Sequence, residues 1–179
     1  AVGNQALDAN TTGNNHVAIG YGALGYNTSG ADNVAIGYAS MGSNTTGASN
    51  VCMGKSSGYN ITGGNYNVAI GHDAGDHITT GSANVSIGYK ALTACTTASN
   101  NTAIGYEALE TVSTGENNTA VGLRALEIST TASNNTAFGY YALANDTVGY
   151  SNTATGVSAG KDITTGCNNL CLGVNAGIN

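Results

Sequence analysis

The chain has 179 residues, among them 27 Gly and no Pro or Trp, and its four Lys and Arg against ten Asp and Glu give a formal charge of −6. Charged residues make up 8% of the chain, against about 25% in an ordinary soluble domain. So few basic residues in a negatively charged chain exclude binding to a nucleic-acid backbone. No apolar run approaches the ~18 residues of a membrane span, and no signal-peptide pattern opens the chain.

A glycine recurs every 17 residues along the whole chain, without one insertion. Such a fixed period is typical of repeat architectures, in which each unit packs only on its neighbours. We therefore predict a single repeat domain over residues 1–179, a fragment of a longer chain, with ten complete units between partial ends. We number the positions of a unit as columns 1 to 17 from this glycine. The units begin at Gly3, Gly20, Gly37, Gly54, Gly71, Gly88, Gly105, Gly122, Gly139, Gly156 and Gly173.

Columns 4 to 8 follow the first turn of each unit and are predicted to be partly interior. Column 4 is always Ala or Ser. Column 5 is Leu or Met in most units, and where a complete unit has Gly there, as at Gly75, column 8 holds Ile, as at Ile78. Native packing density needs about one large aliphatic side chain at this point. Columns 5 and 8 are therefore expected to fill one shared cavity.

Columns 9 to 11 come next and read Thr, Thr, then Gly or Ala in most units, as in Thr11-Thr12-Gly13. This composition predicts a short strand that runs into a turn. Column 14 is Asn in nine of ten units, with His16 in the other, and equivalent side chains in stacked units are expected to form an amide ladder.

Columns 15 to 17 alternate between an apolar or Thr residue, a small residue and an apolar residue, as in Val34-Ala35-Ile36, and this alternation predicts a strand. We expect columns 15 and 17 to face the core, because β-branched side chains suit a packed, pleated surface. Column 16 would then face outward, and its restriction to small residues favours close contact with a second surface, such as another chain. A tight outward face without a partner is the alternative. The interface candidates are Ala18, Ala35, Cys52, Ala69, Ser86, Ala103, Ala120, Ala137, Ala154 and Cys171.

The units show no helical period, so helical solenoids are excluded. One unit cannot bury its own apolar stripe, but stacked units can form a continuous core with parallel strands about 4.8 Å apart. The predicted fold is an all-β parallel β-solenoid of 17-residue coils, a rod on the order of 50 Å long.

Two segments resemble a known family. Asn33-Val34-Ala35-Ile36-Gly37-Tyr38-Ala39-Ser40 resembles the N-x-V-A-I-G-x-x-S repeat in the heads of YadA-type trimeric autotransporter adhesins, and Asn118-Thr119-Ala120-Val121-Gly122-Leu123-Arg124-Ala125-Leu126 is similar to the N-T-A-x-G-Y-x-A-L repeats of bacterial surface proteins and phage tail-fibre stems. The resemblance implies a left-handed β-roll assembled as a homotrimer. The adhesin unit is usually a few residues shorter, so the segment over columns 6 to 12 is longer here.

The residues that could carry chemistry do not recur. Acidic residues occupy variable columns without a repeated pair, so we expect no enzyme and no cofactor. His72, Asp73, Asp76 and His77 are the one cluster of metal-capable side chains, but adjacent residues of an extended chain point in opposite directions, and we expect no metal there.

The four cysteines offer little scope for a disulfide. Cys52 and Cys171 share a column but lie seven units apart, far beyond the reach of a bridge. Cys95 is expected to be a small apolar filler. Cys167 and Cys171 could meet within one unit, although Cys in place of Ala in column 16 is the simpler interpretation.

Two surface properties remain open. The column 9 ladder of Thr and Ser could bind ice, although the second Thr column is adjacent and would point the other way, whereas such surfaces normally have two outward ranks on one face. Sequons could coat the rod with glycan; they lie at Asn10, Asn27, Asn44, Asn60, Asn84, Asn100, Asn117, Asn134 and Asn145.

Taken together, these observations predict a non-catalytic structural segment of an extracellular fibre, on a cell or virion surface, that displays a surface or tip for attachment. Self-association as a homotrimer is expected, with an end-to-end filament as the alternative and ice binding as a second one. Flanking domains would bind a host receptor or glycan, and no nucleic acid or membrane span is expected.

Overall fold

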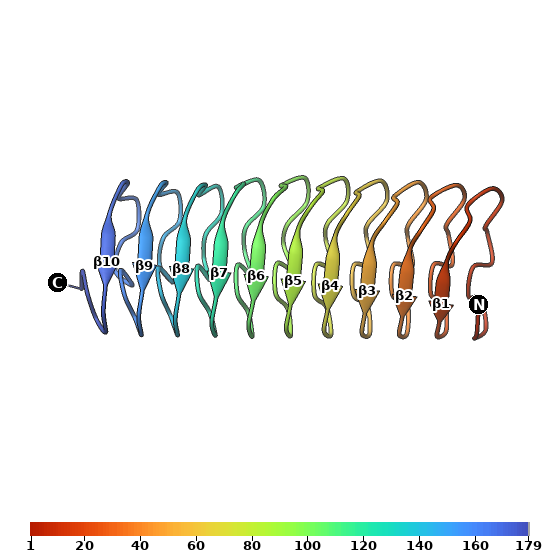
Figure 1. Cartoon of the computed structure of the whole chain (residues 1–179), viewed down its shortest axis with the longest axis horizontal. Helices are drawn as coiled ribbons and strands as arrows, with labels where there is room; N and C mark the ends of the chain where they lie inside the picture. Colours follow the sequence, from red (N-terminus) through yellow and green to blue (C-terminus); the bar gives the residue numbers. More distant parts are fainter. Residues whose placement is uncertain (179) are drawn as a thin grey trace.

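Each unit contributes one three-residue strand, and the strands stack side by side in chain order to form a rod (Figure 1). The computed structural model describes residues 1–178. All ten strands pair in parallel at an offset of 17 residues, so that Ala18 lies opposite Ala35 and Ala35 opposite Cys52. The predicted β-solenoid of 17-residue coils is confirmed. The strands are β1 Val17–Ile19, β2 Val34–Ile36, β3 Val51–Met53, β4 Val68–Ile70, β5 Val85–Ile87, β6 Thr102–Ile104, β7 Thr119–Val121, β8 Thr136–Phe138, β9 Thr153–Thr155 and β10 Leu170–Leu172.

The Thr segment of each unit is not a strand, contrary to our prediction. The amides of Thr28, Ser29 and Gly30 all donate to the carbonyl of Thr45 in the next coil, at 3.0, 3.1 and 3.3 Å. A β-ladder spreads its hydrogen bonds over successive carbonyls. Three amides converging on one oxygen curl the backbone instead, and columns 9 to 11 become a turn. Among residues 1–178 there is no helix, and hence none able to cross a membrane.

The column 1 glycine is required by the backbone and by the stacking of the coils. Its φ lies between 113° and 139° in all eleven units, a region that L side chains rarely adopt. A Cβ built on Gly71 would lie 2.6 Å from the carbonyl oxygen of Gly88 in the next coil. The 17-residue period of glycine therefore marks the place where the backbones of successive coils meet most closely.

The strand faces are the reverse of those we predicted. Column 16 points into the coil, and its side chains are at most 7% exposed, whereas Val17 and Ile19 are each 43% exposed. The prediction that column 16 forms an outward interface is wrong for the whole set, namely Ala18, Ala35, Cys52, Ala69, Ser86, Ala103, Ala120, Ala137, Ala154 and Cys171.

The small residues of column 16 are explained by the narrow interior of the coil. A Cβ built on Gly75 in column 5 would lie 2.9 Å from the Ser86 hydroxyl and 3.5 Å from the Ala69 Cβ. The large aliphatic side chain that each unit places in column 5 or 8 occupies this space. Column 16 is therefore small because of packing within the chain.

The shared cavity of columns 5 and 8 is confirmed. Leu24 and Ile61, which come from the two different columns, are both fully buried. A Cβ on Gly58 would lie 2.8 Å from Ile61 Cδ1, so the Ile of column 8 occupies the space above the Gly of column 5. The unit with Leu109 and Val112 buries both side chains, which shows that the cavity tolerates some excess volume.

The amide ladder of column 14 is also confirmed. Asn67 Nδ2 donates to the carbonyl of Gly81 at 2.9 Å, and its Oδ1 accepts from the backbone amide of Asn84 at 3.0 Å. The same pattern continues to Asn169. A second, shorter ladder runs through column 8, where Asn44 Nδ2 donates to Asn27 Oδ1 at 2.6 Å. These fully buried amides tie each coil to the next with hydrogen bonds that replace water.

Candidate functional site

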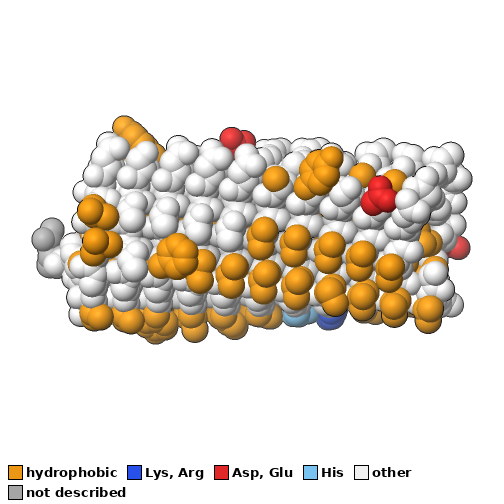
Figure 2. Space-filling model, in the orientation of Figure 1, with side chains coloured by type: hydrophobic (Ala, Val, Ile, Leu, Met, Phe, Trp, Pro, Cys, Tyr) orange, Lys and Arg blue, Asp and Glu red, His pale blue; other side chains and the backbone are white. Residues whose placement is uncertain are grey.

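The outward side chains of columns 15 and 17 form one continuous face along the strands, which we call the sheet face. Figure 2 shows its hydrophobic side chains in rows along the rod. None of the twenty strand residues in these two columns is charged. Met53, Ile70 and Phe138 are 39%, 36% and 43% exposed. Apolar side chains that line up on one regular surface mark candidate sites of protein interaction, so the sheet face is a candidate interaction surface.

The sheet face changes in character along the rod. Column 15 is Val in β1 to β5 and Thr in β6 to β9. Column 17 stays aliphatic from Ile19 to Val121, with Phe138 and Thr155 following. Thr in column 15, as at Thr102, keeps the branched shape of Val and adds a hydroxyl. The face is thus purely apolar over β1 to β5 and amphipathic over β6 to β9, and β10 has Leu in both columns.

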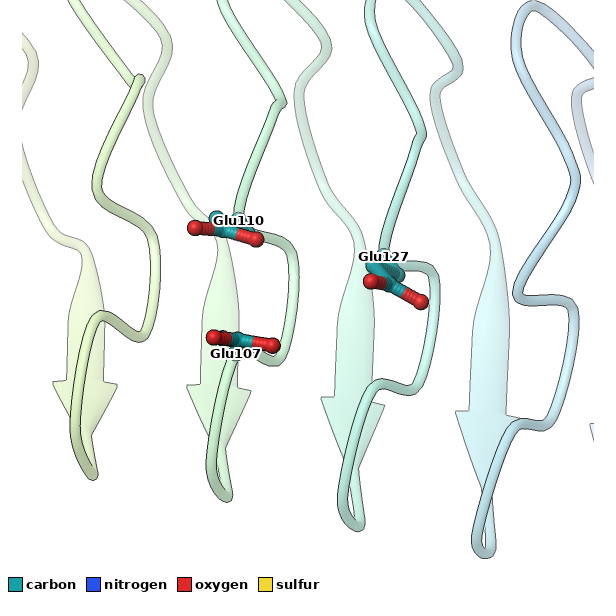
Figure 3. Close-up of side chains that lie close together, drawn as sticks. All are labelled: Glu107, Glu110 and Glu127. Atoms are coloured by element: carbon teal, nitrogen blue, oxygen red, sulfur yellow. The ribbon is translucent and has the colours of Figure 1, made fainter.

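A charged cluster occupies the turn after the strands, where columns 3 and 6 of successive coils lie side by side (Figure 3). The carboxylates of Glu107, Glu110 and Glu127 have oxygens within 4.8 Å of one another. Arg124 Nε contacts Glu107 Oε2 at 2.8 Å and Glu127 Oε1 at 3.5 Å, and Lys90 Nζ lies 3.9 Å from Glu110 Oε1. The guanidinium thus binds two of the three carboxylates, and the cluster is an ion-pair network.

The ionisation of this network follows its contacts. A hydrogen bond to Tyr141, another to Glu107 and the nearby carboxylates raise the pKa of Arg124. Partial burial and the neighbouring Glu107 raise the pKa of Glu110. We did not predict this cluster. The signal was present, since Glu107 and Arg124 share column 3 in consecutive units, and the period alone brings them together.

The four weak metal candidates form two separate pairs. His72 Nε2 lies 3.6 Å from Asp73 Oδ1, and His77 Nδ1 lies 3.8 Å from Asp76 Oδ2. Burial raises the pKa of Asp76. Among residues 1–178, the carboxylates of Glu107, Glu110 and Glu127 are the one set of three potential ligands that converge.

All four cysteines are free in the described structure. Cys52 and Cys95 are fully buried, and burial raises the pKa of both thiols, that of Cys95 to about 12. Cys95 is the small apolar filler that we predicted, facing the carbonyl of Ala98 at 3.6 Å. Cys167 is half-buried and Cys171 sits in the core at 7% exposure.

The Thr ladder of column 9 uses its hydroxyls to link coils. Thr28 Oγ1 donates to the carbonyl of Thr45 at 2.9 Å, and Thr45 Oγ1 donates to that of Thr62 at 2.9 Å. The pattern runs from Thr11 to Thr147. Column 10 is outward, as at Thr46 and Thr80. The structure therefore places one outward Thr rank here, with the second rank half-buried along most of the rod.

The sequons divide by column. Asn27, Asn44 and Asn84 are fully buried and hydrogen-bonded, so an attached glycan would require the coil to open, and these three candidates are wrong. Asn10, Asn60 and Asn145 are half-buried. The exposed candidates are Asn100, Asn117 and Asn134, all in column 13.

Comparison with known proteins adds no family to this description. No family model matches the chain, and neither does any curated protein or solved structure. The sheet face and the turns beside it are thus the features from which a function can be inferred.

Proposed function

We propose that this chain is a non-catalytic structural segment of an extracellular fibre and that it self-associates through the sheet face. The observation that carries the proposal is the uninterrupted pair of rows of outward, uncharged side chains, exposed or half-buried, on ten parallel strands. Burial of apolar surface stabilises association by roughly 25 cal/mol per Å² before the costs of assembly. A rod with such a face in water therefore gains free energy when the face packs against another copy.

The direction of the face bears on the kind of assembly. The sheet face runs parallel to the rod axis, so its burial joins copies side by side. Three copies around a common axis would bury one face each, which agrees with the homotrimer implied by the resemblance of the repeat. An end-to-end filament, the alternative, would use the open edges of terminal coils and leave the sheet face exposed.

Rigidity supports a mechanical role. Every coil is tied to the next by the strand pairing, by the buried amide ladder and by the Thr hydroxyl ladder. Continuous hydrogen bonding of this kind makes the rod resist bending and local opening. We propose that it holds a tip or binding surface away from a cell or virion, and that flanking domains carry the host receptor or glycan contacts.

The test is the mass of the protein in solution, measured by light scattering, together with a sheet-face variant. The unmodified chain should give a discrete mass of three times 17.7 kDa. In Ile70→Lys with Ile87→Lys, a buried interface would have to accept two charges, and the mass should fall to that of a monomer. Thr80→Lys with Thr97→Lys places the same charges on outward column 10 and should remain trimeric.

Three outcomes would decide against this assembly. A monomeric unmodified chain removes the self-association proposal. A variant with charges on the sheet face that stays trimeric shows that the interface lies elsewhere. Long filaments in electron micrographs that persist in the sheet-face variant favour end-to-end stacking.

Ice binding is a second candidate, and the sheet face favours it more than the column 9 ladder does. Columns 15 and 17 are two outward ranks two residues apart on one regular surface, and β6 to β9 carry Thr in column 15. This function requires an uncovered face. A monomer that shows thermal hysteresis, lost in Ile70→Lys with Ile87→Lys, would favour ice binding over a fibre interface.

A further inference from the structure

An open cleft of about 260 Å³ lies on the first coils, beside the turn that follows the strands. It lies where columns 3 and 6 of the units that begin at Gly20 and Gly37 carry only Gly or Ala, between Gln5 and Asp8 of the preceding unit and Tyr59 of the following one. Gly22 and Ala39 occupy column 3, and Gly25 and Gly42 occupy column 6. Further along the rod the same two columns hold the charged network around Arg124, which fills the corresponding space.

Four of the ten tyrosines of the chain line this cleft, namely Tyr21, Tyr26, Tyr38 and Tyr59. Tyr26 and Tyr38 are 67% and 56% exposed, so much of each side chain is open to a ligand. Tyrosine combines an apolar ring with a hydroxyl that both donates and accepts hydrogen bonds. The walls of the cleft therefore suit a ligand that is itself both apolar and rich in hydroxyl groups.

The floor of the cleft is backbone whose polar groups are already bonded. The amide of Gly25 donates to the carbonyl of Gly22 at 3.1 Å, and the amide of Tyr26 donates to the carbonyl of Gly42 at 3.1 Å. These amides are thus already used, and specific contacts must come from the walls. Besides the tyrosines, Gln5 and Asp8 contribute an amide and a carboxylate.

The charge of the cleft restricts the ligand. Asp8 is the one charged side chain among the described lining residues, and none of them is Lys, Arg or His. An anionic ligand would meet a carboxylate with no compensating cation, in a chain of formal charge −6. Acidic sugars and phosphates are therefore disfavoured.

Cationic ligands are disfavoured by the ring geometry. A cage for a quaternary ammonium group needs aromatic faces turned toward the cation. The rings of Tyr21 and Tyr38 are stacked on each other, with centroids 5.3 Å apart and an interplanar angle of 12°. Each ring covers one face of the other, so these two tyrosines do not form the walls of such a cage.

We infer that this cleft binds a neutral saccharide, with the phenol groups, Gln5 and Asp8 as its hydrogen-bonding partners. Sugar hydroxyls donate and accept hydrogen bonds as the phenols do, and the C–H groups of a pyranose can pack on the glycine surface of Gly22, Gly25 and Gly42. This inference goes beyond the proposed structural role, because the cleft lies on columns 2, 3, 6 and 7 and the sheet face on columns 15 and 17. A sugar site on the rod would make the shaft itself adhesive.

The test uses saturation-transfer NMR on the full chain with a panel of neutral sugars: glucose, galactose, mannose, N-acetylglucosamine and their β-1,4-linked disaccharides. At least one should bind with a Kd on the order of 1 mM, as expected for a small open site. Tyr26→Ala should weaken that sugar by at least about tenfold. Tyr66→Ala, a 70% exposed tyrosine outside the cleft, should leave its affinity unchanged.

A variant that fills the cleft tests whether the sugar binds there. Gly22→Tyr should abolish binding, because column 3 already accommodates Tyr141 at a φ of 56° and a Cβ at Gly22 has no atom within 4 Å. Ser158→Tyr makes the same change in column 3 of a distant coil and should bind as before. Circular dichroism of both variants should match the unmodified chain.

Several results would overturn the inference. One is the failure of every sugar in the panel to show saturable transfer. Another is binding of choline chloride in place of the sugars, and a third is undiminished sugar binding by Gly22→Tyr. The oligomeric mass does not enter any of these, so failure here is distinguishable from failure of the fibre proposal.

Discussion

At the scale of the residue, the column 1 glycine sets how closely the coils stack. Its φ near 130° and its approach to the next carbonyl leave no room for a Cβ, and both partners are backbone that cannot rotate away. Gly71→Ala should therefore cost more than about 4 kcal/mol of unfolding free energy, or prevent folding. The measurement is thermal and urea denaturation followed by circular dichroism.

Gly22→Ala is the matched control for that change. Gly22 also has a positive φ, of 64°, but a Cβ there meets nothing within 4 Å. Only the conformational cost of the left-handed region remains, about 1–2 kcal/mol. Similar losses of stability for Gly71→Ala and Gly22→Ala would show that backbone conformation, and not the approach of the next coil, explains the period.

At the scale of the element, one large aliphatic group per coil fills the space between columns 5 and 8. Gly75→Leu should destabilise by about 1–3 kcal/mol, because a Cβ on Gly75 would already lie 3.0 Å from Ile78 Cδ1 and the rest of the new side chain would overlap it. Ile78→Cys alone should cost about 2 kcal/mol by leaving a void. Together they reproduce the Leu92 and Cys95 pair of the next coil.

The double variant should therefore be more stable than the sum of the two single changes implies. Urea denaturation of the unmodified chain, both single variants and the double variant gives the coupling free energy. A value of at least about 1 kcal/mol would show that the two columns share one cavity. Additive single changes would mean that columns 5 and 8 pack independently.

The strand also shows where prediction from the sequence stops. The period, the strand at columns 15 to 17, the shared cavity and the amide ladder followed from residue types and spacing. Which face of the strand points to the core did not follow from them, because a three-residue alternation such as Val34-Ala35-Ile36 fits either orientation. What decides it is the width of the coil, and that width depends on side chains from columns 5 and 8 opposite the strand.

The candidate surfaces were predictable to a similar degree. Columns that share a face bring Glu107 beside Arg124 and Tyr21 beside Tyr38, and the period alone would have indicated both. The cleft could not be predicted, since it depends on how far the turn at Gly22 stands from the tyrosine rings. Asn27 and Asn44 are buried because they belong to an amide ladder inside the coil. The sequon pattern is the same in a buried ladder and in an exposed loop, so it did not predict this burial.

At the scale of the whole molecule, the core is one column of buried side chains that runs along the rod, so stability depends on contacts between neighbouring coils. A single coil cannot fold alone, so the ladders that cross each junction should couple the coils strongly. The buried thiols of Cys52 in β3 and Cys95, in the unit that begins at Gly88, can report on this coupling. Each can react only when its own part of the rod opens.

We expect Cys52 and Cys95 to become reactive together along a urea gradient, because the rod between them opens as one unit. The measurement is pulse alkylation with iodoacetamide, read for each peptide by mass spectrometry. Cys167 is half-buried and should react already without urea, which serves as the internal control. Clearly separated midpoints for Cys52 and Cys95 would mean that the coils open in independent groups, and the continuous ladders would then not make the rod a single cooperative element.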